Sequence, residues 1–431
     1  MTARNTAVTT RYPTIHIIGA GLAGLSAAVE LTARGRKVIV HEAARQAGGR
    51  CRSYFDATLG LTIDNGNHFV AAGNHAVAAY LARIGASDRL AGDDEARFDF
   101  VDVRDGARWT LRPNAGRVPW WVFDKRRRVP GTRAAEYLRL AALLGRHPGK
   151  SVGEVIPVHG PLWDKLLDTF FRSALNTTPE RGSAALAGAI VRETLAAGGD
   201  ACRPRYANPT LAAAFVDPAL AWLAANGTEV RFGARVRTIE RNGGRVTALR
   251  FIDEAMPLDA GDAVIVATPP WIAAELLPEI TVPDEYHAIV NAHFAVTPPP
   301  GIPAILALIG GTAEWLVAHP DRISVTVSAA DDLAKKPRAA IAATLWADIA
   351  AAYGIDAPQH AAMPPFQVIK EARATFAATP AQDARRPAAA TATPGLFLAG
   401  DWTQTGLPAT IEGALRSGVT AAGLAVRHRG L

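Results

Sequence analysis

The first forty residues place an alanine-rich stretch between two short apolar runs. Residues 14–18 read TIHII, residues 37–40 read KVIV, and residues 22–33 between them are rich in Ala and Leu up to a break near Gly35. Short continuous apolar runs are typical of strands buried on both faces, and the middle stretch has the length and composition of a helix. The pattern therefore predicts a strand, a helix and a second strand of one sheet.

The rest of the chain alternates helical and strand-like segments. Residues 74–225 read mostly helical, with breaks rich in Pro and Gly. Two alternating runs flank Asn242-Gly243-Gly244, which predicts a hairpin over residues 235–252. The later pattern predicts strands at 263–267, within 288–328 and at 396–398, and helices at 337–353 and 408–426, the last with Ile411, Leu415, Val419, Ala422 and Val426 on one face.

Strands of one buried sheet thus recur at both ends of the chain. This recurrence predicts an α/β fold in which a discontinuous sheet domain holds an inserted second domain. The sheet domain is assigned to residues 14–73, 205–268 and 390–428. The inserted domain, of mixed α+β structure, is assigned to residues 74–204 and 269–389.

The composition is that of an ordinary globular protein, with 49% hydrophobic and 20% charged residues. Cys51 and Cys202 stand far apart, which excludes a disulfide scaffold and a cysteine-based metal site and fits a reducing compartment. Apolar stretches such as residues 183–191 are about half the length of a membrane span. Because the first residues also lack the apolar core of a secretory signal, a cytoplasmic location is expected.

The net charge of +6 comes from one segment of the chain. Residues 112–150 contain ten Lys or Arg and only two acids, and Trp120-Trp121-Val122-Phe123 stands directly before Asp124 and Lys125–Arg128. Tryptophans beside cations suit the headgroup layer of a membrane, and a solvated charged face next to a core helix is the other interpretation. Peripheral membrane contact through residues 120–128 is expected. Nucleic-acid binding is not, because no nucleic-acid-binding fold accompanies the segment.

A glycine-rich phosphate-binding pattern follows the first predicted strand. Gly19, Gly21 and Gly24 form GxGxxG between a strand and a helix, and Glu42 ends the second strand. The first glycine permits a tight turn, the second lets the backbone approach a pyrophosphate, and the third lets helix and strand pack closely. The backbone at Leu22 and Ala23 then offers N–H groups to the phosphates, while Glu42, with Ala43 beside it, would bind the adenosine ribose.

Further motifs resemble the flavoproteins of the glutathione-reductase and amine-oxidase type. These are Gly48-Gly49-Arg50, the run Leu398–Asp401 that reads LAGD, and Glu412-Gly413-Ala414 at a helix start. The resemblance implies a Rossmann-like FAD-binding domain and tightly bound FAD. It assigns cofactor contacts to Gly49, Arg50, Val236, Gly400, Asp401, Thr410, Ile411, Gly413 and Ala414, in addition to the glycine-rich turn.

Four segments narrow the resemblance. They are LFLAGDWTQTGLPATIEGALRSG at 396–418, DNGNHF at 64–69, SALNTTP at 173–179 and VIKEARATFAATP at 368–380. Together they resemble the hydroxysqualene dehydroxylases, also described as squalene-associated FAD-dependent desaturases, although Asn67 departs from the pattern. The resemblance implies reduction of hydroxysqualene to squalene in squalene and hopanoid biosynthesis, on an apolar C30 substrate. NAD(P)H or a separate reductase would supply the electrons.

The catalytic residues are less well marked than the cofactor site. His68 stands in the loop expected near the flavin and could protonate or hydrogen-bond the leaving hydroxyl, or serve as a structural histidine. The charged pairs Arg192-Glu193 and Glu371 with Arg373 fit two positions equally well, the lining of a pocket or a solvated edge. Trp402 would either form a wall of the flavin site or serve as a packing residue. No metal site is predicted. The alternatives are a carotenoid or phytoene-type desaturase, a flavin amine oxidase, and a non-catalytic flavin protein that binds isoprenoids.

Overall fold

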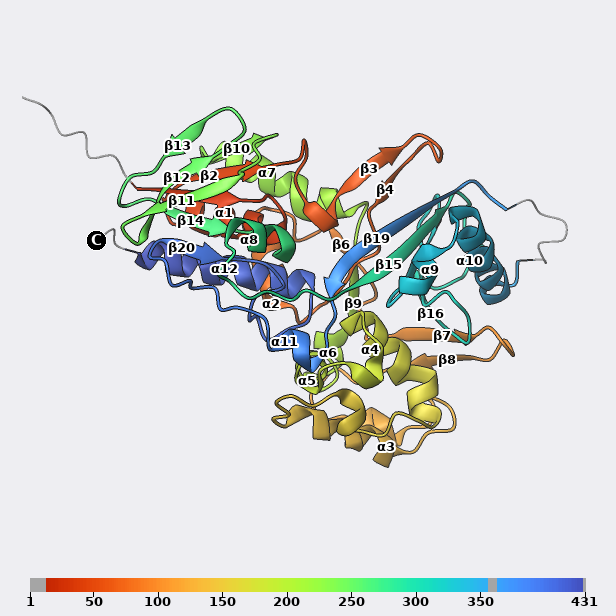
Figure 1. Ribbon diagram of the computed structural model, residues 1–431. Coiled ribbons are helices and arrows are strands. Elements are labelled where there is room, and N and C mark those ends of the chain that lie inside the picture. Colours follow the sequence, from red (N-terminus) through yellow and green to blue (C-terminus); the bar gives the residue numbers. More distant parts are fainter. Residues whose placement is uncertain (1–12, 356–362, 429–431) are drawn as a thin grey trace, which may run out of the picture.

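The computed structural model describes residues 13–355 and 363–428. The upper left part of the molecule in Figure 1 is built on a five-stranded sheet whose strands all run parallel. The strand order is β10-β2-β1-β14-β20, with β1 at Thr14–Ile18, β2 at Lys37–Glu42, β10 at Glu229–Phe232, β14 at Ala263–Val266 and β20 at Leu396–Leu398.

Alternate residues of these strands face two different layers. Ile17, Val40 and Ile265 pack against helices, whereas Val264 and Val266 belong to the core on the other face. The helical layer contains α1 (Leu22–Ala33), α2 (His75–Arg83), α7 (Asp217–Ala225) and α12 (Ile411–Arg427). The other layer contains α8 (Pro270–Leu276) and an antiparallel sheet of β11 (Thr238–Asn242), β12 (Arg245–Arg250) and β13 (Ala255–Pro257).

The first and last helices pack at backbone distance. A side chain at Gly418 of α12 would place its Cβ 2.4 Å from the carbonyl oxygen of Ala23 in α1. The hydroxyl of Ser26 donates to the carbonyl of Leu415 at 2.9 Å. Glycine at this crossing therefore lets the C-terminal helix lie directly on the helix that follows the glycine-rich turn.

A second, seven-stranded sheet occupies the right of Figure 1. It is antiparallel except where β16 runs beside β7. One face is covered by α9 (Asp331–Lys335) and α10 (Arg338–Tyr353). The order is β19 (Phe366–Phe376), β15 (Tyr286–Phe294), β18 (Ile323–Val327), β17 (Trp315–Ala318), β16 (Ile305–Ile309), β7 (Phe98–Asp102) and β8 (Arg108–Leu111).

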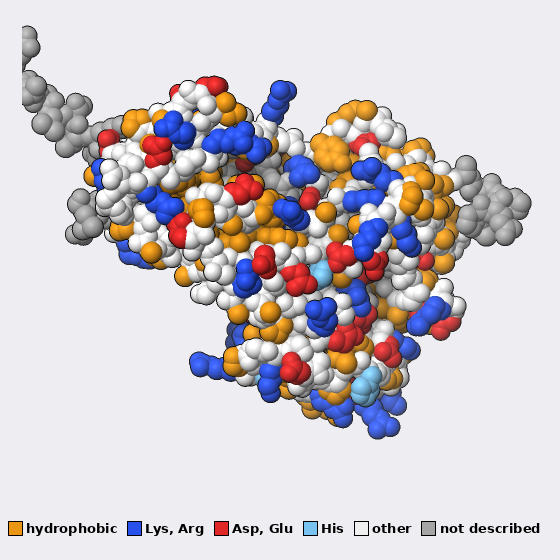
Figure 2. All heavy atoms as spheres, in the orientation of Figure 1, with side chains coloured by type: hydrophobic (Ala, Val, Ile, Leu, Met, Phe, Trp, Pro, Cys, Tyr) orange, Lys and Arg blue, Asp and Glu red, His pale blue; other side chains and the backbone are white. Residues whose placement is uncertain are grey.

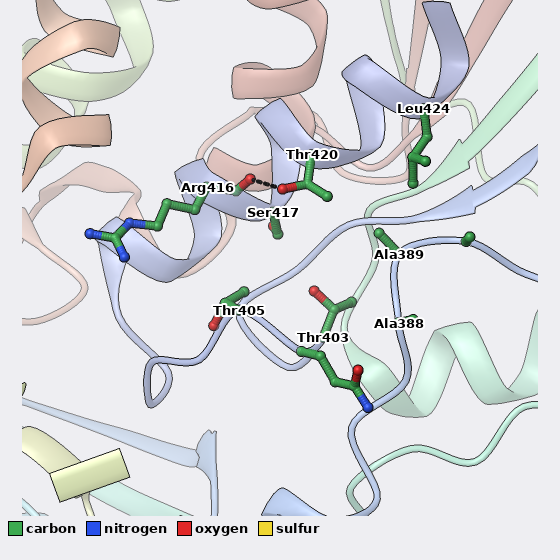
Figure 3. Close-up of a pocket in the computed structure, with 10 residues that line it drawn as sticks. Ala388, Ala389, Thr403, Thr405, Arg416, Ser417, Thr420 and Leu424 are labelled. Atoms are coloured by element: carbon green, nitrogen blue, oxygen red, sulfur yellow. Dashed lines mark hydrogen bonds between the residues drawn. The ribbon is translucent and has the colours of Figure 1, made fainter. Parts of the chain in front are cut away.

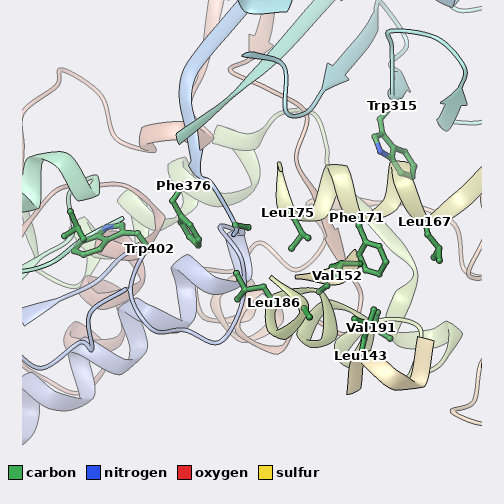
Figure 4. Close-up of a cluster of buried hydrophobic side chains, with 14 of the residues drawn as sticks. Leu143, Val152, Leu167, Phe171, Leu175, Leu186, Val191, Trp315, Phe376 and Trp402 are labelled. Carbon is green, nitrogen blue, oxygen red and sulfur yellow. The ribbon is translucent and has the colours of Figure 1, made fainter. Parts of the chain in front are cut away.

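Helices below this sheet cover its other face. Figure 4 shows their core, in which Phe171 and Leu175 point toward Leu186 and Val191, while Trp315 comes from the sheet. The helices here are α3 (Ala134–Leu138), α4 (Asp168–Leu175), α5 (Ala184–Glu193) and α6 (Gly199–Cys202), with α11 (Pro380–Asp383) nearby. Two small sheets pair β3 (Ser53–Asp56) with β4 (Leu61–Asp64), and β5 (Phe69–Ala71) and β6 (Leu90–Ala91) with β9 (Pro204–Ala207).

The structure confirms the opening strand–helix–strand unit, the hairpin and the return of the chain to one sheet. The strands of the five-stranded sheet all lie in the segments predicted for the discontinuous domain, and those of the seven-stranded sheet lie in the inserted segments. The domain boundaries themselves stay a prediction.

Three sequence predictions were wrong. Residues 74–225 are not mostly helical, because β7 and β8 join the large sheet through β16, whose partner residues lie about two hundred positions away. The last helix begins at Ile411 rather than Pro408, since the Thr410 hydroxyl caps it by accepting from the Gly413 N–H. Val419 is also 41% exposed rather than buried, and Gly418 takes the contact position beside it.

Candidate functional site

The glycine-rich turn has two crowded glycines and one open one. A Cβ at Gly19, which has φ +106°, would lie 2.7 Å from the carbonyl oxygen of Ala267, and one at Gly24 would lie 1.9 Å from that of Gly19. At Gly21, by contrast, a Cβ would meet nothing within 4 Å. The turn thus needs Gly19 and Gly24 for its own packing, whereas Gly21 leaves the surface above the backbone free for a ligand.

The acid at the end of β2 lies against this turn. The two carboxylate oxygens of Glu42 accept from the backbone N–H groups of Ala20 and Ala44, each at 2.7 Å. Ala43 lies between Glu42 and Ala44 in the sequence. Leu22 and Ala23 are the first residues of α1, and no side chain caps the N-terminus of this helix. Since the first N–H groups of a helix have no partner within the helix, this corner offers donors for phosphate and a carboxylate for hydroxyl groups.

An ion pair joins the second glycine turn to the C-terminal motif. Gly48 and Gly49 adopt φ +102° and +56°, and the next residue, Arg50, places one guanidinium nitrogen 2.7 and 2.8 Å from the two carboxylate oxygens of Asp401. A second nitrogen donates to the carbonyl of Ala374 in β19 at 2.6 Å. A narrow cavity of about 10 Å³ borders the pair, with room for about one water molecule.

The C-terminal motif itself is tightly packed. The Gly400 N–H donates to the hydroxyl of Ser417 at 2.8 Å. Trp402 is 1% exposed and donates its indole N–H to the carbonyl of Thr268, so it is both a buried packing residue and part of the narrow cavity's wall. Behind it, Thr410, Ile411, Gly413 and Ala414 form the start of α12, while Val236 is buried on the other layer of the sheet.

The loop that carries His68 rests on the seven-stranded sheet. Asp64 accepts from the Ser53 hydroxyl and the Leu211 N–H, which makes it a structural residue. The amide of Asn67 donates to Thr326 at 3.1 Å. Burial, and next the positive charge of Arg50, lower the pKa of His68 to about 4, against the opposing charge of Asp401. His68 is therefore neutral near pH 7 and suited to hydrogen bonding.

The other charged pairs have distinct positions. Glu371 accepts from Asn65 at 3.3 Å, and the guanidinium of Arg373 lies 5.0 Å from the ring centre of Trp271. Glu193 binds Arg416 of α12 through two contacts of 2.7 and 2.9 Å, so it ties the helical region to the sheet domain. Arg192 donates to the Leu144 carbonyl. The structure thus brings Glu371 to Asn65 and into electrostatic reach of Arg50, and it leaves Arg192 and Glu193 in structural roles.

A larger cavity, of about 390 Å³, lies between α12 and the segments 388–390 and 403–405 (Figure 3). Figure 3 shows Thr403 and Thr405 on one side of it and Arg416, Thr420 and Leu424 of α12 on the other. None of the residues predicted to bind the cofactor lines it. Among the described residues, no group of three or more His, Cys, Asp or Glu side chains could hold a metal ion, and no helix is long and apolar enough to cross a membrane.

Comparison with known proteins identifies the family. The flavin-containing amine oxidoreductases match residues 22–426. A hydroxysqualene dehydroxylase from Rhodopseudomonas palustris is 52% identical over 412 residues, which cover 95% of this chain and 98% of the relative. Those from Zymomonas mobilis and Sinorhizobium fredii are each 49% identical over 96% of this chain, and 99% and 98% of the relatives. This chain belongs to the hydroxysqualene dehydroxylase family.

Solved structures agree on the fold. An oxidoreductase from Methanosarcina mazei matches with a TM-score of 0.70 over 95% of this chain and 100% of its own, at 16% identity. Cyclohexylamine oxidase from Brevibacterium oxydans matches with a TM-score of 0.66 over 96% of this chain and 99% of its own, also at 16% identity. The predicted class, α/β with a Rossmann-like domain, is confirmed. As a member of this flavin family, the protein is an FAD-dependent oxidoreductase.

Glu314, which precedes β17, is one of the buried acids that the sequence pattern did not single out. It is 9% exposed, accepts from the Ser328 N–H at 2.8 Å and lies 3.7 Å from the Arg172 guanidinium. Burial raises the pKa of Glu314 to about 7, against these contacts and with a further contribution from Asp168. A lone Glu after Gly310-Gly311 resembles any turn residue, so only the tertiary structure reveals its burial.

The open face of Gly21 yields a first prediction. Gly21→Val should leave the apoprotein folded, because its backbone has φ −72° and the new Cβ meets no protein atom within 4 Å. The same side chain should block the pyrophosphate and weaken FAD binding by at least tenfold. Fluorescence titration of the apoprotein with FAD, together with its melting temperature, measures both effects. Unchanged FAD affinity in a folded variant would show that the cofactor does not approach this turn.

The raised pKa of Glu314 yields a second prediction. Between pH 4.5 and 7 the unfolded chain loses this proton while the folded protein keeps it, so stability falls as pH rises. The loss amounts to about 3 kcal/mol for a shift of this size. Glu314→Gln removes the titration, so the variant should gain stability relative to wild type between pH 5 and pH 8. Unfolding curves at several pH values test this, and parallel pH dependences would contradict it.

Proposed function

We propose that this protein reduces hydroxysqualene to squalene by hydride transfer from reduced FAD. The observation that carries the proposal is the 52% identity to a hydroxysqualene dehydroxylase over 95% of the chain. The site supports it, since Arg50, which follows the second glycine turn, acts on His68, and the residue after His68, Phe69, packs on Trp315. The squalene and hopanoid pathways are the expected setting, with NAD(P)H or a partner reductase as electron donor.

FAD is proposed to lie along the glycine-rich turn and the C-terminal motif. Gly19, Gly21, Leu22, Ala23 and Gly24 would hold the pyrophosphate, and the Glu42 carboxylate would leave its backbone partners for the ribose hydroxyls. Val236 would contact the adenine, and the start of α12 would face the flavin ring, where a helix N-terminus stabilises the anion of the reduced form. The remaining contacts are proposed for Ala43, Gly49, Arg50, Gly400, Asp401, Thr410, Ile411, Gly413 and Ala414.

The proposed reaction is a substitution of hydroxide by hydride at an allylic carbon. Reduced FAD supplies the hydride; one proton must also reach the leaving hydroxyl, so that the products are squalene and water. The protein's part is to bind the apolar chain, exclude water from the developing allylic cation and hydrogen-bond the hydroxyl. His68, neutral near pH 7, is proposed for this hydrogen bond rather than as the acid.

Isotope transfer tests the function directly. Protein reduced with a deuterated donor in deuterium oxide should give squalene with one deuterium at the former carbinol carbon. The oxidised protein should give no squalene under the same conditions. If reduced protein forms no squalene, or squalene without the label, the dehydroxylase proposal fails. Conversion of phytoene by the oxidised protein would favour the desaturase alternative, and oxidation of amines would favour the amine oxidase.

Membrane contact is proposed at the helical end of the molecule. Of the nine large hydrophobic side chains exposed among the described residues, five lie in residues 118–144: Val118, Trp120, Phe123, Leu138 and Leu144. Figure 2 shows Lys and Arg side chains gathered around the end of the molecule that carries α3. Arg127 stacks on Trp120 at 4.8 Å, and the Arg126 side chain is 90% exposed. Exposed apolar side chains with cations beside them suit an anionic lipid surface.

Vesicle binding tests this contact. Replacing Lys125 and Arg126 with Gln should weaken binding to vesicles containing phosphatidylserine about 30-fold, at about 1 kcal/mol per charge. Arg128 is left in place because it donates to the Val122 carbonyl and supports the fold. The matched control replaces Arg36 and Lys37, an exposed basic pair at the start of β2, and should bind like wild type. Equal vesicle binding by both variants would show that residues 118–144 form a solvated face and do not contact the membrane.

A further inference from the structure

One buried acceptor lies in the loop beside His68. Asn65 is 4% exposed, and its backbone is fixed on both sides: its N–H donates to the carbonyl of Arg52 at 3.0 Å, and its carbonyl accepts from Asn291 at 3.4 Å. The side-chain nitrogen donates to Glu371 at 3.3 Å. The side-chain oxygen, Oδ1, forms no hydrogen bond with any described residue.

The orientation of this amide follows from its partner. The carboxylate of Glu371 only accepts hydrogen bonds, so the amide nitrogen must face it and Oδ1 must point the other way. A flipped amide would set a carbonyl against a carboxylate. Oδ1 therefore stays an acceptor without a donor, and a buried acceptor in this state is costly unless a ligand supplies the donor.

The neighbouring polar groups are already paired with one another. Asn67 donates to Thr326, the Thr326 hydroxyl donates to Asn291, and His293 contacts Ser324 and the Asp64 carbonyl. These groups form a polar row on the face of the seven-stranded sheet that meets the loop. In this row Asn65 Oδ1 is the acceptor left for something that the chain itself does not provide.

Apolar side chains begin directly beyond the loop. Phe69 packs on Trp315 with ring centres 5.6 Å apart, and Phe100 packs on both Trp315 and Trp109. On the other side, Arg50 joins the loop's surroundings to Asp401 and the C-terminal motif. Asn65 Oδ1 is an open acceptor beside this aromatic region, in which the buried indole N–H groups of Trp109 and Trp315 also lack a partner among the described residues. These open groups fit a ligand that is hydrocarbon except for one hydroxyl group, which can both donate and accept.

We propose that Asn65 Oδ1 accepts a hydrogen bond from the substrate hydroxyl and thereby selects the alcohol over hydrocarbons of the same length. The inference rests on the proposed function and names the residue that confers its specificity. A site built to pair a hydroxyl rejects the analogue that lacks it, because the buried group is then left unpaired. Squalene, the product, lacks the donor and so leaves easily. Phytoene lacks it too, which disfavours desaturase substrates.

Binding to the oxidised, FAD-loaded protein tests the proposal without turnover. Hydroxysqualene and squalene are titrated in detergent, with tryptophan fluorescence as the readout. Wild type should bind the alcohol about 10- to 100-fold more tightly than squalene. Asn65→Leu should abolish this preference, because it weakens the binding of the alcohol and leaves the binding of the hydrocarbon unchanged. Asn67→Ala is the matched control from the same loop, and should keep the ratio because its amide is partnered within the protein.

A second variant guards against a folding defect in Asn65→Leu. The double variant N65D/E371Q reverses the direction of the hydrogen bond between the two positions and keeps a free acceptor oxygen at position 65. It should therefore retain the preference for the alcohol. A ratio that survives in Asn65→Leu, or that disappears in N65D/E371Q while FAD stays bound, overturns the proposal.

The possible alternatives give separate results. If Asn65 pairs with a flavin N–H or an internal water, Asn65→Leu will change FAD affinity or stability and leave the alcohol-to-hydrocarbon ratio intact, which refutes the subsite. A wild-type protein that forms squalene but binds both compounds equally refutes the subsite alone. A wild-type protein that binds neither compound refutes the proposed function as well.

Discussion

The ion pair between Arg50 and Asp401 is the contact on which the site depends. It joins two glycine turns that are 351 residues apart in sequence, and Arg50 also holds β19 through the carbonyl of Ala374. The parallel sheet, the C-terminal motif and the seven-stranded sheet therefore meet at one guanidinium group. Because Asp401 is almost fully buried, loss of Arg50 would take away the guanidinium that binds both of its carboxylate oxygens, a costly defect.

Each sheet contributes a different chemistry to the junction. The parallel sheet presents backbone donors at its carboxyl edge, as a dinucleotide requires, with Gly21 leaving the approach open. The seven-stranded sheet presents a polar row at β15 and β18 that gives way to aromatic residues at β17, β7 and β8. A cofactor on one side and a hydrocarbon with a single hydroxyl on the other would thus meet at the loop of Asn65 and His68.

The sequence could predict what is encoded locally. The turn at Gly19–Gly24, the strands around it and the hairpin at 235–252 follow from short-range patterns, and the return of Leu396–Leu398 to the first sheet follows from its apolar run. The pattern failed where a partner is distant. FDFVD at Phe98–Asp102 is a strand because β16 lies beside it, and nothing nearby in sequence announces that neighbour. The pairing of Asn65 with Glu371, 306 residues away, and the burial of Glu314 were hidden for the same reason.

A single-turnover experiment measures the central claim most directly. The FAD-loaded protein is reduced without oxygen, freed of excess reductant and mixed with one equivalent of hydroxysqualene, while flavin absorbance and squalene are followed together. The oxidised flavin spectrum should return at the same rate as squalene appears, with one squalene formed per flavin. A flavin that stays reduced in the presence of bound hydroxysqualene would contradict this claim.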